Sequence, residues 1–297
     1  MALDTQVPAL VDPALADFAD IEPLRSGRLA TVFRAREIAT GRIVALKVVD
    51  RRQYPARVTE AFERESTVLA ALGSHPNIVT MYRRLTLSDG RPALVLELCR
   101  GSLADRLGRG EPIPPSDAAS IGVKIAGALE TAHRGGVLHR DVRTENILVT
   151  EFGEPALSDF GIATLHAGGP ALFEAATVHT APELIEGGLA GVTTDVYGLA
   201  STIYELVAGA PAFHAYQGEA TASVCLRILR DPAPPIFAPA VPLELSDVLL
   251  WGLAKDPAAR PPSAAWLAAE LSRIAARHGW PRIRLLIREP RQPVGAG

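Results

Sequence analysis

Hydrophobic residues in the first hundred positions follow the spacing of strands, interrupted once by the spacing of a helix. Residues 43–49 form one β-rich run, and residues 93–98 form another after the turn at 88–92. Between them, residues 57–72 place apolar side chains at helical spacing opposite a charged face, which predicts an amphipathic helix. The inward positions of this helix would be Val58, Phe62, Leu69 and Leu72.

Beyond residue 102 the pattern becomes mainly helical. Ser116 or Asp117 can cap a helix that ends at a Gly-Gly pair, residues 135–136. In residues 195–208 apolar side chains cover most of the circumference, which predicts a buried core helix ending at Gly209. The inward stripe of the earlier helix would consist of Ile121, Ile125, Leu129 and Ala132.

This order of elements predicts an α+β fold with a small β-rich lobe, a short hinge near residues 97–101 and a larger, mainly helical lobe. We expect residues 1–17 to form a loose leader and residues 18–98 to form the β-rich lobe. Residues 99–275 would form the helical lobe, and residues 276–297 a basic tail. A cleft would lie between the lobes.

Composition narrows the class of protein. Of the 297 residues, 48% are hydrophobic and 21% charged, which is typical of a globular protein with a substantial core, and the net charge of −3 gives no reason to expect nucleic acid as a partner. Two cysteines, Cys99 and Cys225, cannot build a disulfide framework and indicate reduced thiols. The N-terminus has no basic region before an apolar run, and no apolar stretch reaches the roughly 18–20 residues that span a bilayer. We therefore expect a cytoplasmic protein.

Candidate chemistry is concentrated in residues 137–149 and in the Asp-Phe-Gly of residues 159–161. Together they place two carboxylates, Asp141 and Asp159, and one amide, Asn146, at the spacing that phosphoryl transfer requires. One acid can accept a proton from an attacking hydroxyl, while the amide and the other acid hold magnesium beside a nucleotide. An isolated Asp-Phe-Gly would be weak evidence, but the two motifs in this order are a strong signal.

The two motifs resemble those of protein kinases, and the resemblance covers roughly residues 18–275. The Ala-Pro-Glu of residues 181–183, followed by Asp195 and Arg260, favours a protein kinase over a small-molecule phosphotransferase. Residues 120–133 are similar to bacterial Ser/Thr kinases of the actinobacterial type. The resemblance implies a bilobal protein kinase-like fold, ATP with Mg²⁺ or Mn²⁺ as cofactors, and a protein substrate with a Ser or Thr acceptor.

On the catalytic side, the resemblance makes Asp141 the base that orients the substrate hydroxyl. Asn146 and Asp159 would bind the metal. Arg143 stands where the family has lysine; a guanidinium can still reach the γ-phosphate, but its planar fork differs in shape and reach from an ammonium.

Other residues would support the site rather than react. By resemblance, Glu183 pairs with Arg260 to anchor the segment on which a peptide docks, and Asp195 braces the backbone of the catalytic loop. Buried charges are costly without partners, which agrees with such structural roles. The apolar stack that joins the lobes would consist of His139, Phe160, Leu69 and Met81.

On the nucleotide side, strand alternation places Ala45 and Lys47 on one face of the first β-rich run. The resemblance assigns Lys47 to the α- and β-phosphates and pairs it with Glu65. Glu63 competes for that role, but the position of Glu65 matches the helix of the family. The nucleotide pocket would be lined by Gly27, Val32, Ala45, Lys47, Glu97, Cys99 and Leu148.

The phosphate-binding turn departs furthest from the family, which has three glycines there. Only Gly27 is present; Arg25 and Ala30 replace the other two in the register that ends at Val32. Glycine serves in such turns because the backbone must approach phosphate without a Cβ in the way. Arg25 would either crowd the turn or contribute a positive charge, and both interpretations stay open.

The departures from the family pattern allow a second function, that of a pseudokinase which acts as a nucleotide-binding or scaffolding regulator. Arg25, Ala30 and Arg143 favour it, whereas the catalytic acids and Lys47 argue against it.

The tail also has two interpretations. Its six arginines between residues 273 and 291 either belong to a terminal helix and an extended strand packed on the lobe, or form a docking segment for an acidic partner.

The segment 160–182 bears on control. Many kinases order it by phosphorylating a residue that pairs with the arginine before the catalytic acid, here Arg140. Its hydroxyl acceptors are Thr164, Thr177 and Thr180, while Glu174 could supply a fixed charge instead. An ungapped alignment puts Ala176, and a one-residue gap puts Thr177, where the family has a threonine that contacts the catalytic Asp. We predict that phosphorylation of this segment is not the on-switch.

Overall fold

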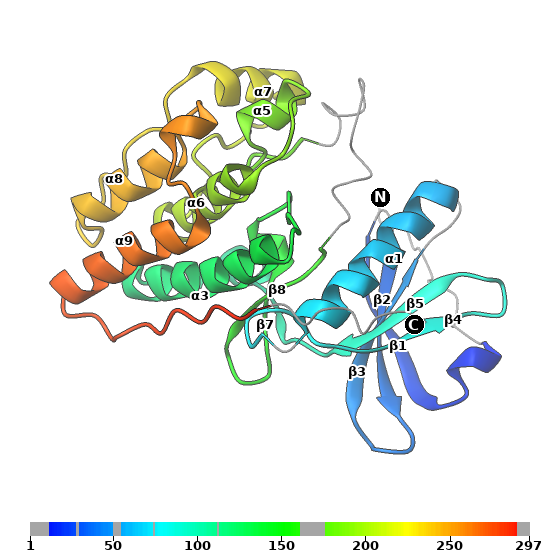
Figure 1. Ribbon diagram of the computed structural model, residues 1–297. Helices are drawn as coiled ribbons and strands as arrows, with labels where there is room; N and C mark the ends of the chain where they lie inside the picture. The colour runs from blue at the N-terminus through cyan, green and yellow to red at the C-terminus, as the bar shows by residue number, and fades with distance from the viewer. Residues whose placement is uncertain are drawn as a thin grey trace.

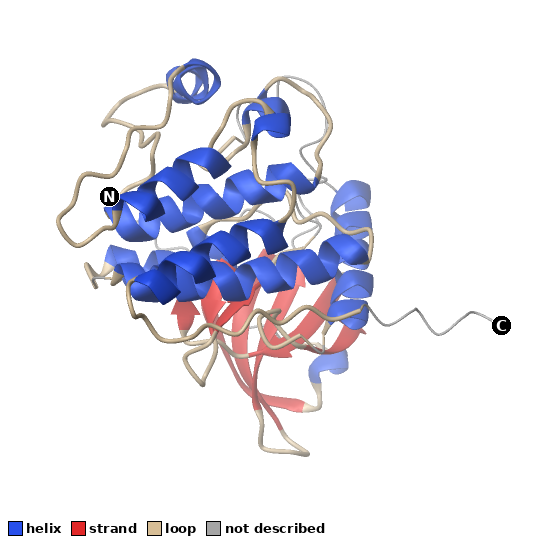
Figure 2. Cartoon of the chain, turned by 60° about the vertical axis from the view of Figure 1, so that its left-hand side comes forward, coloured by secondary structure: helices blue, strands red, loops and turns tan. Residues whose placement is uncertain are grey.

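The chain folds into two lobes, one built on a sheet with a single helix and a larger one built from helices (Figure 1). The computed structural model describes residues 12–27, 30–49, 55–73, 75–111, 113–160 and 176–289. Figure 2 shows the strands gathered on one side of the molecule and most of the helices on the other. This is the bilobal α+β fold that the sequence predicts.

An antiparallel five-stranded sheet forms the smaller lobe. Its strands are β1 (Phe18–Ser26), β2 (Ala30–Glu37), β3 (Ile43–Val49), β4 (Met81–Thr86) and β5 (Pro92–Glu97), in the order β1-β2-β3-β5-β4. β3 has the bounds that the hydrophobic run predicts, and β5 begins and ends one residue earlier than predicted. Val32 lies opposite Lys47 in the β2–β3 register, so two predicted nucleotide contacts are neighbours.

The predicted amphipathic helix is α1 (Pro55–Leu72), which contacts β3, β4 and β5. Phe62, Leu69 and Leu72 are buried as predicted, whereas the side chain of Val58 lies outside the described residues. Glu65 precedes Leu69 by four positions and therefore shares its buried face. The helix thus carries a carboxylate toward the sheet.

Alternate residues of β3 serve two different environments. Val44, Leu46 and Val48 belong to a hydrophobic core on one face of the sheet, whereas Ala45 and Lys47 line the cleft on the other. The hydrophobic core that contains Val44, Leu46 and Val48 also includes Leu15 of a short 3₁₀ helix (Pro13–Leu15). This part of the segment expected to form a loose leader is therefore packed on the sheet.

A second, three-stranded sheet lies where the lobes meet. It consists of β6 (Gly101–Ser102), β7 (Ile147–Val149) and β8 (Pro155–Leu157), with α2 (Leu103–Gly108) following β6 directly. The amide of Arg100 donates to the carbonyl of Val149 at 2.8 Å, which ties the chain that leaves the first lobe to the strand after the catalytic motif.

Helices make up most of the larger lobe. The longer ones are α3 (Pro115–Arg134), α6 (Val192–Ala208), α7 (Thr221–Arg230), α8 (Leu243–Gly252) and α9 (Ala264–Arg277), and the shorter ones are α5 (Pro182–Ile185) and the 3₁₀ turns Thr144–Asn146 and Pro257–Ala259. α6 is buried around most of its circumference and contacts α3, α8 and α9, as its apolar pattern predicts. It begins three residues before the predicted start and ends at Gly209, whose φ of 77° is the left-handed conformation that favours glycine.

The predicted start of α3 is wrong. Pro114 occupies the N-cap position without a side-chain cap, and Pro115 is the first helical residue, so Ser116 and Asp117 lie inside the first turn. Proline at the first helical position has its φ fixed in the helical range and lacks only an N–H that would stay unpaired, which explains this start. The inward stripe of α3 is buried as predicted, and its C-cap is Gly135.

The tail packs against the larger lobe. After α9 the chain runs extended under α3, outside helix and strand, with Trp280, Ile283 and Leu285 against the hydrophobic core (Figure 1). The amide of Arg288 donates to Thr131 Oγ1 at 3.1 Å. The packing of the tail on the lobe is therefore confirmed, whereas the predicted extended strand is wrong, because residues 281–289 belong to no strand. An acidic partner stays a prediction.

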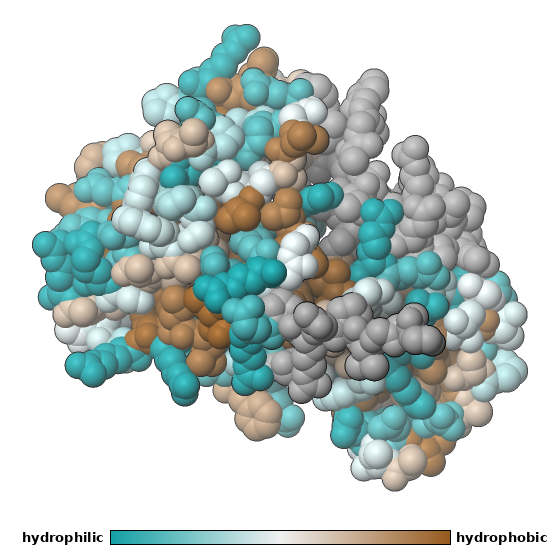
Figure 3. All heavy atoms as spheres, viewed as in Figure 1, coloured by the Kyte–Doolittle hydropathy of each residue, from teal (hydrophilic) through white to brown (hydrophobic). Residues whose placement is uncertain are grey.

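On the surface shown in Figure 3, hydrophilic residues are interspersed with separate groups of hydrophobic ones. Within the described ranges, no helix combines the length and the apolar character that crossing a bilayer requires.

Candidate functional site

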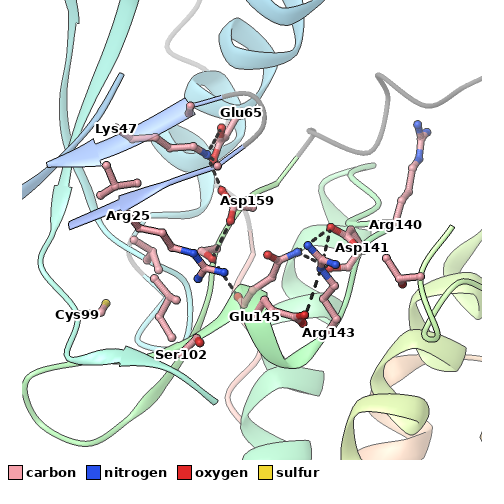
Figure 4. A pocket seen from close by; sticks show the side chains of 18 of the residues that line it. Arg25, Lys47, Glu65, Cys99, Ser102, Arg140, Asp141, Arg143, Glu145 and Asp159 are labelled. Atoms are coloured by element: carbon pink, nitrogen blue, oxygen red, sulfur yellow. Dashed lines mark hydrogen bonds and ion pairs between the residues drawn. The ribbon is translucent and has the colours of Figure 1, made fainter. Parts of the chain in front are cut away.

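Residues from both lobes line one cleft of about 1340 Å³. Each residue predicted for the nucleotide pocket lies on its wall, and so do Glu65, Asp141, Arg143, Asn146 and Asp159. Figure 4 shows Lys47 and Glu65 coming from β3 and α1 on one side, and Asp141, Arg143 and Asp159 from the loops around β7 and β8 on the other. The fold therefore brings the predicted site residues together across more than a hundred positions of sequence.

Lys47 is the centre of the site. Its Nζ donates to both carboxylate oxygens of Glu65, at 2.8 and 2.9 Å, and to Asp159 Oδ1 at 2.5 Å (Figure 4). Glu63 lies on the exposed face of α1, 3.7 Å from Arg84. Glu65 is therefore the partner of Lys47, as predicted, and the same ammonium also reaches the second lobe.

The three groups shift one another's acidity. Burial raises the pKa of Glu65 to about 7, although the charge of Lys47 opposes this shift. Burial also acts to raise the pKa of Asp159, but the charge and hydrogen bond of Lys47 outweigh it and hold that pKa below its ordinary value. Burial acts to lower the pKa of Lys47, and its two carboxylate partners raise it above its ordinary value.

The phosphate-binding turn is closed by its backbone. The amide of Gly27 donates to the carbonyl of Ala30 at 2.9 Å, and a Cβ on Gly27 would lie 3.2 Å from that same oxygen. Arg25 lines the cleft beside this turn (Figure 4). Residues 28–29, at the tip of the turn, lie outside the described ranges.

The hinge side of the cleft contains one group that the sequence did not reveal. Ser102 caps α2 by accepting from the amide of Asp105, while the Asp105 carboxylate accepts from the amide of Ser102, and both residues line the cleft. The amide of Ser102 donates to the Asp105 carboxylate and lowers its pKa. The charge of Arg25 acts in the same direction, and burial opposes both without cancelling them. The Ser-x-x-Asp spacing of a capping box was the signal available in the sequence.

Both cysteines are free thiols, as predicted. Cys225 is buried, whereas Cys99 is partly buried in the hinge, where burial and then Glu97 raise the pKa of its thiol to about 12.

The catalytic loop holds its polar groups close together. Asn146 Nδ2 donates to the carbonyl and to Oδ2 of Asp141, both at 2.8 Å. Arg143 Nε lies 3.4 Å from Asp141 Oδ2 and 3.9 Å from Glu145 Oε2. Ser158 donates from its amide and its hydroxyl to the carbonyl of Asn146, which sets Asp159 beside Asn146.

Buried Asp195 at the start of α6 braces this loop, as predicted. Its carboxylate accepts from the amides of His139 and Arg140, at 2.8 and 2.6 Å, and contacts His133 Nε2 at 2.7 Å. Arg140 and Asp159 both have left-handed φ values, 67° and 64°. Such backbone is costly for residues other than glycine and persists where neighbours hold it, here through Asp195 and Lys47.

Two further predicted supports are present. Arg260 binds Glu183 through two parallel bonds of 2.7 and 2.9 Å and is almost fully buried. The rings of His139 and Phe160 meet edge to face at 4.7 Å. Phe160 and Leu69 belong to one hydrophobic cluster, against which Met81 packs, so the predicted stack joins the two lobes.

The segment that follows Ala176 lines the same cleft. Thr177 Oγ1 lies 3.3 Å from Thr180 Oγ1 and accepts from the amide of His179. Thr164, Glu174 and Gly161 lie outside the described residues, so the prediction on phosphorylation stays a prediction.

A sequence model described as "Protein kinase domain" matches residues 18–271. The chain is 37% identical over 272 residues to the serine/threonine-protein kinase PknK of Mycobacterium tuberculosis, an alignment that covers 89% of this chain and 24% of that protein. It is 32% identical over 273 residues to the serine/threonine-protein kinase PknL of the same organism, covering 88% of this chain and 66% of PknL. A probable serine/threonine-protein kinase of Corynebacterium efficiens is 32% identical over 286 residues, covering 90% of this chain and 43% of that protein. The chain thus spans about a quarter of the length of the PknK relatives it matches.

Proposed function

The chain belongs to the protein kinase family, and we propose that it transfers the γ-phosphoryl group of ATP to a Ser or Thr hydroxyl of a protein. The observation that carries this proposal is the position of Lys47, which binds Glu65 of α1 and Asp159 of the other lobe at the same time. An ammonium held in this way is oriented for a phosphate without a change in the fold.

In this proposal the nucleotide lies between Val32, Ala45 and Leu148, with Glu97 and Cys99 at the hinge. Lys47 then binds the α- and β-phosphates under the turn that contains Gly27. The oxygen donors of Asn146 and Asp159 suit a hard cation such as Mg²⁺, because the amide nitrogen of Asn146 already donates to Asp141 and its oxygen is the ligating atom. A bound Mg²⁺, or Mn²⁺ in its place, would neutralise charge on the phosphates.

Asp141 acts on the acceptor. Its carboxylate takes the proton of the attacking hydroxyl as the new P–O bond forms and the bond from the γ-phosphorus to the bridging oxygen breaks, which leaves ADP. Asn146 holds that carboxylate in place through its 2.8 Å bond to Oδ2. Arg143, 3.4 Å from the same oxygen, is close enough to turn toward the γ-phosphate.

The class of acceptor and the cellular compartment are also part of the proposal. The acceptor is a protein, since Glu183 and Arg260 anchor the segment after Ala176 beside Asp141. We place this reaction in the cytoplasm, where free thiols such as Cys99 and Cys225 persist.

A pseudokinase is the second candidate, and the turn at Arg25, Gly27 and Ala30 favours it. Two side chains there stand where backbone amides would approach phosphate. Such a protein would bind nucleotide without transferring phosphate.

One experiment separates the two candidates. Label from γ-labelled ATP is followed into the protein itself and into a generic basic protein, for the wild type and for Asp141→Asn. Asp247→Asn, on the exposed face of α8, is the matched control. We expect transfer by the wild type and the control, and a loss of about 10²–10⁴-fold in Asp141→Asn with nucleotide affinity retained. Equal transfer by Asp141→Asn, or none by the wild type, would contradict the proposal.

A further inference from the structure

The inner part of α6 contacts the catalytic loop at three places. Asp195 holds the amides of residues 139 and 140, and Thr202 Oγ1 donates to the carbonyl of Val142 at 3.2 Å. Glu205 Oε2 accepts from Thr144 Oγ1 at 2.9 Å. Asp195 and Glu205 are ten residues apart, about 15 Å along the helix axis. The part of α6 that contacts the catalytic loop therefore covers most of the helix.

Glu205 differs from Asp195 and Thr202 because it also contacts the segment after Ala176. Its Oε2 lies 3.3 Å from Nε2 of His179, whose side chain is 5% exposed. The other ring nitrogen of His179, Nδ1, lies 2.8 Å from the hydroxyl of Ser201, one turn earlier on α6. Two residues four positions apart on one helix face therefore bind both nitrogens of one imidazole.

Both ring nitrogens of His179 have a polar partner. Nδ1 shares a hydrogen bond with the Ser201 hydroxyl, and Nε2 lies against the Glu205 carboxylate. Buried polar groups without partners are costly, so the ring is held in one orientation. Its backbone is fixed as well, because the amide of His179 donates to Thr177 Oγ1 at 3.2 Å.

We propose that His179 and Glu205 are positioning residues that set the acceptor-binding segment 176–181 relative to Asp141, with Glu205 as the bridge between this segment and Thr144. The inference rests on the proposed function, since the segment matters only if an acceptor protein docks there. Ala176, Thr177 and Thr180 of this segment line the cleft that contains Asp141. Thr144 lies three residues after Asp141 in the same loop, so one carboxylate aligns both sides of the acceptor site.

The nucleotide side makes no contact with this bridge in the described part of the chain. Lys47 donates to Glu65 and to Asp159. A loosened bridge should therefore raise the KM for the acceptor and leave the KM for ATP unchanged. Hydrolysis of ATP without an acceptor protein should stay unchanged as well.

The test compares His179→Leu, His179→Gln and Thr144→Val with the wild type, with myelin basic protein as acceptor. We expect His179→Leu to raise the acceptor KM about tenfold, the effect of losing one close contact with a charged group. His179→Gln keeps an amide donor near Glu205 and should recover most of this loss. His278→Leu is the matched control, because His278 faces Glu244 at 3.5 Å at the end of α9, away from the cleft.

A double variant tests the bridge itself. If Thr144 and His179 act through one carboxylate, the effects of Thr144→Val and His179→Leu on kcat/KM for the acceptor will combine to less than their product. Should His179→Leu fail to fold in a thermal unfolding experiment, Glu205→Gln takes its place in the comparison with Thr144→Val, because it removes the carboxylate that both residues contact.

The possible outcomes are distinct. Parallel changes in the KM values for ATP and acceptor, or multiplicative effects in the double variant, would overturn the bridge and leave the proposed function intact. Folded variants with the acceptor KM of the wild type would do the same. A wild type that transfers no phosphate would contradict the proposed function, and the bridge with it.

Discussion

On the catalytic side of the cleft, buried side chains hold the backbone, whereas on the nucleotide side strand register and a backbone turn do so. Asp195 binds two amides of the catalytic loop, and Arg260 binds Glu183 under the docking segment. The phosphate-binding turn is closed by one bond between the amide of Gly27 and the carbonyl of Ala30. The backbone of the catalytic loop is therefore held by particular charged residues, whereas the backbone of the phosphate-binding turn is held by its own hydrogen bond.

Lys47 is the point at which the two sides meet. It extends from β3 on the nucleotide side and binds Asp159 on the catalytic side. Glu65 binds the same ammonium, so one cation pairs α1 with β3 and also the first lobe with the second. Each prediction below changes one side, or the link between them, and compares the result with a control variant.

The largest effect should come from breaking the buried pair on the catalytic side. Arg260→Leu leaves Glu183 without its cation and three backbone carbonyls, of Thr193, Ala254 and Lys255, without their donor. We expect a loss of about 3–5 kcal/mol in the free energy of unfolding, measured by denaturant titration.

Arg36→Gln is the control for this variant. It breaks an ion pair of the same 2.7 Å length to Asp20, but in the exposed part of the nucleotide lobe, and should cost about 0–1 kcal/mol. Similar losses in the two variants would contradict the view that the catalytic side depends on buried charges.

The link through Lys47 should respond to pH. Because the pKa of Glu65 is raised to about 7, its contribution to stability is fully present below its ordinary value and is lost as pH rises through about 7. The pKa of Asp159 is lowered, so its contribution is present above its ordinary value and is lost only at more acidic pH. Between pH 5 and pH 8, the wild type should lose about 1–3 kcal/mol of stability relative to Glu65→Gln.

Denaturant titrations at the two pH values measure this difference. Glu63→Gln, on the exposed face of α1, should keep the pH dependence of the wild type. If Glu65→Gln also keeps it, the ammonium of Lys47 fully compensates the burial of Glu65, and the expected shift is wrong.

A third prediction concerns the tail, which contacts both lobes. His75 Nε2, in the first lobe, donates to the carbonyl of Leu286 at 3.0 Å, and Gly127 of α3 allows that carbonyl to lie against the helix. A Cβ on Gly127 would lie 2.3 Å from this oxygen, so Gly127→Ala must displace the tail. We expect a net loss of about 1–2 kcal/mol and faster tryptic cleavage after Arg282 and Arg284.

Gly108→Ala is the matched control, because a Cβ at this helical position meets nothing within 4 Å. It should gain the helix propensity of alanine, up to about 1 kcal/mol, and leave tryptic cleavage of the tail unchanged. A Gly127→Ala protein that resists trypsin as the wild type does would show that the tail is not held by α3.

The sequence located the residues of the catalytic side, because they are side chains at fixed spacing. Asp141, Asn146, Asp159 and Asp195 could each be found from a short motif, and the bracing of the loop by Asp195 is as predicted. The roles of the other three toward hydroxyl and metal stay predictions. The start of α3 was mispredicted, since a proline at the first helical position competed with two good capping residues.

Contacts between distant single residues could not be predicted in the same way. His179, Ser201 and Glu205 belong to no motif that assigns them a role, and only the docking of the segment after Ala176 on α6 brings them together. The second partner of Lys47 likewise depends on how closely the lobes approach. Such contacts follow from packing across the fold rather than from local spacing.

The smallest effect, and the most direct test of the nucleotide side, comes from the phosphate-binding turn. Arg25→Gly with Ala30→Gly should tighten ATP binding about threefold, because backbone amides could approach the phosphates more closely. Isothermal calorimetry measures this change, and Arg25→Gln separates crowding from charge by keeping most of the side chain. Since Arg25 lines the cleft, weaker binding in both variants would make it a phosphate ligand, and the phosphate-binding turn would then depend on a charged side chain as the catalytic loop does.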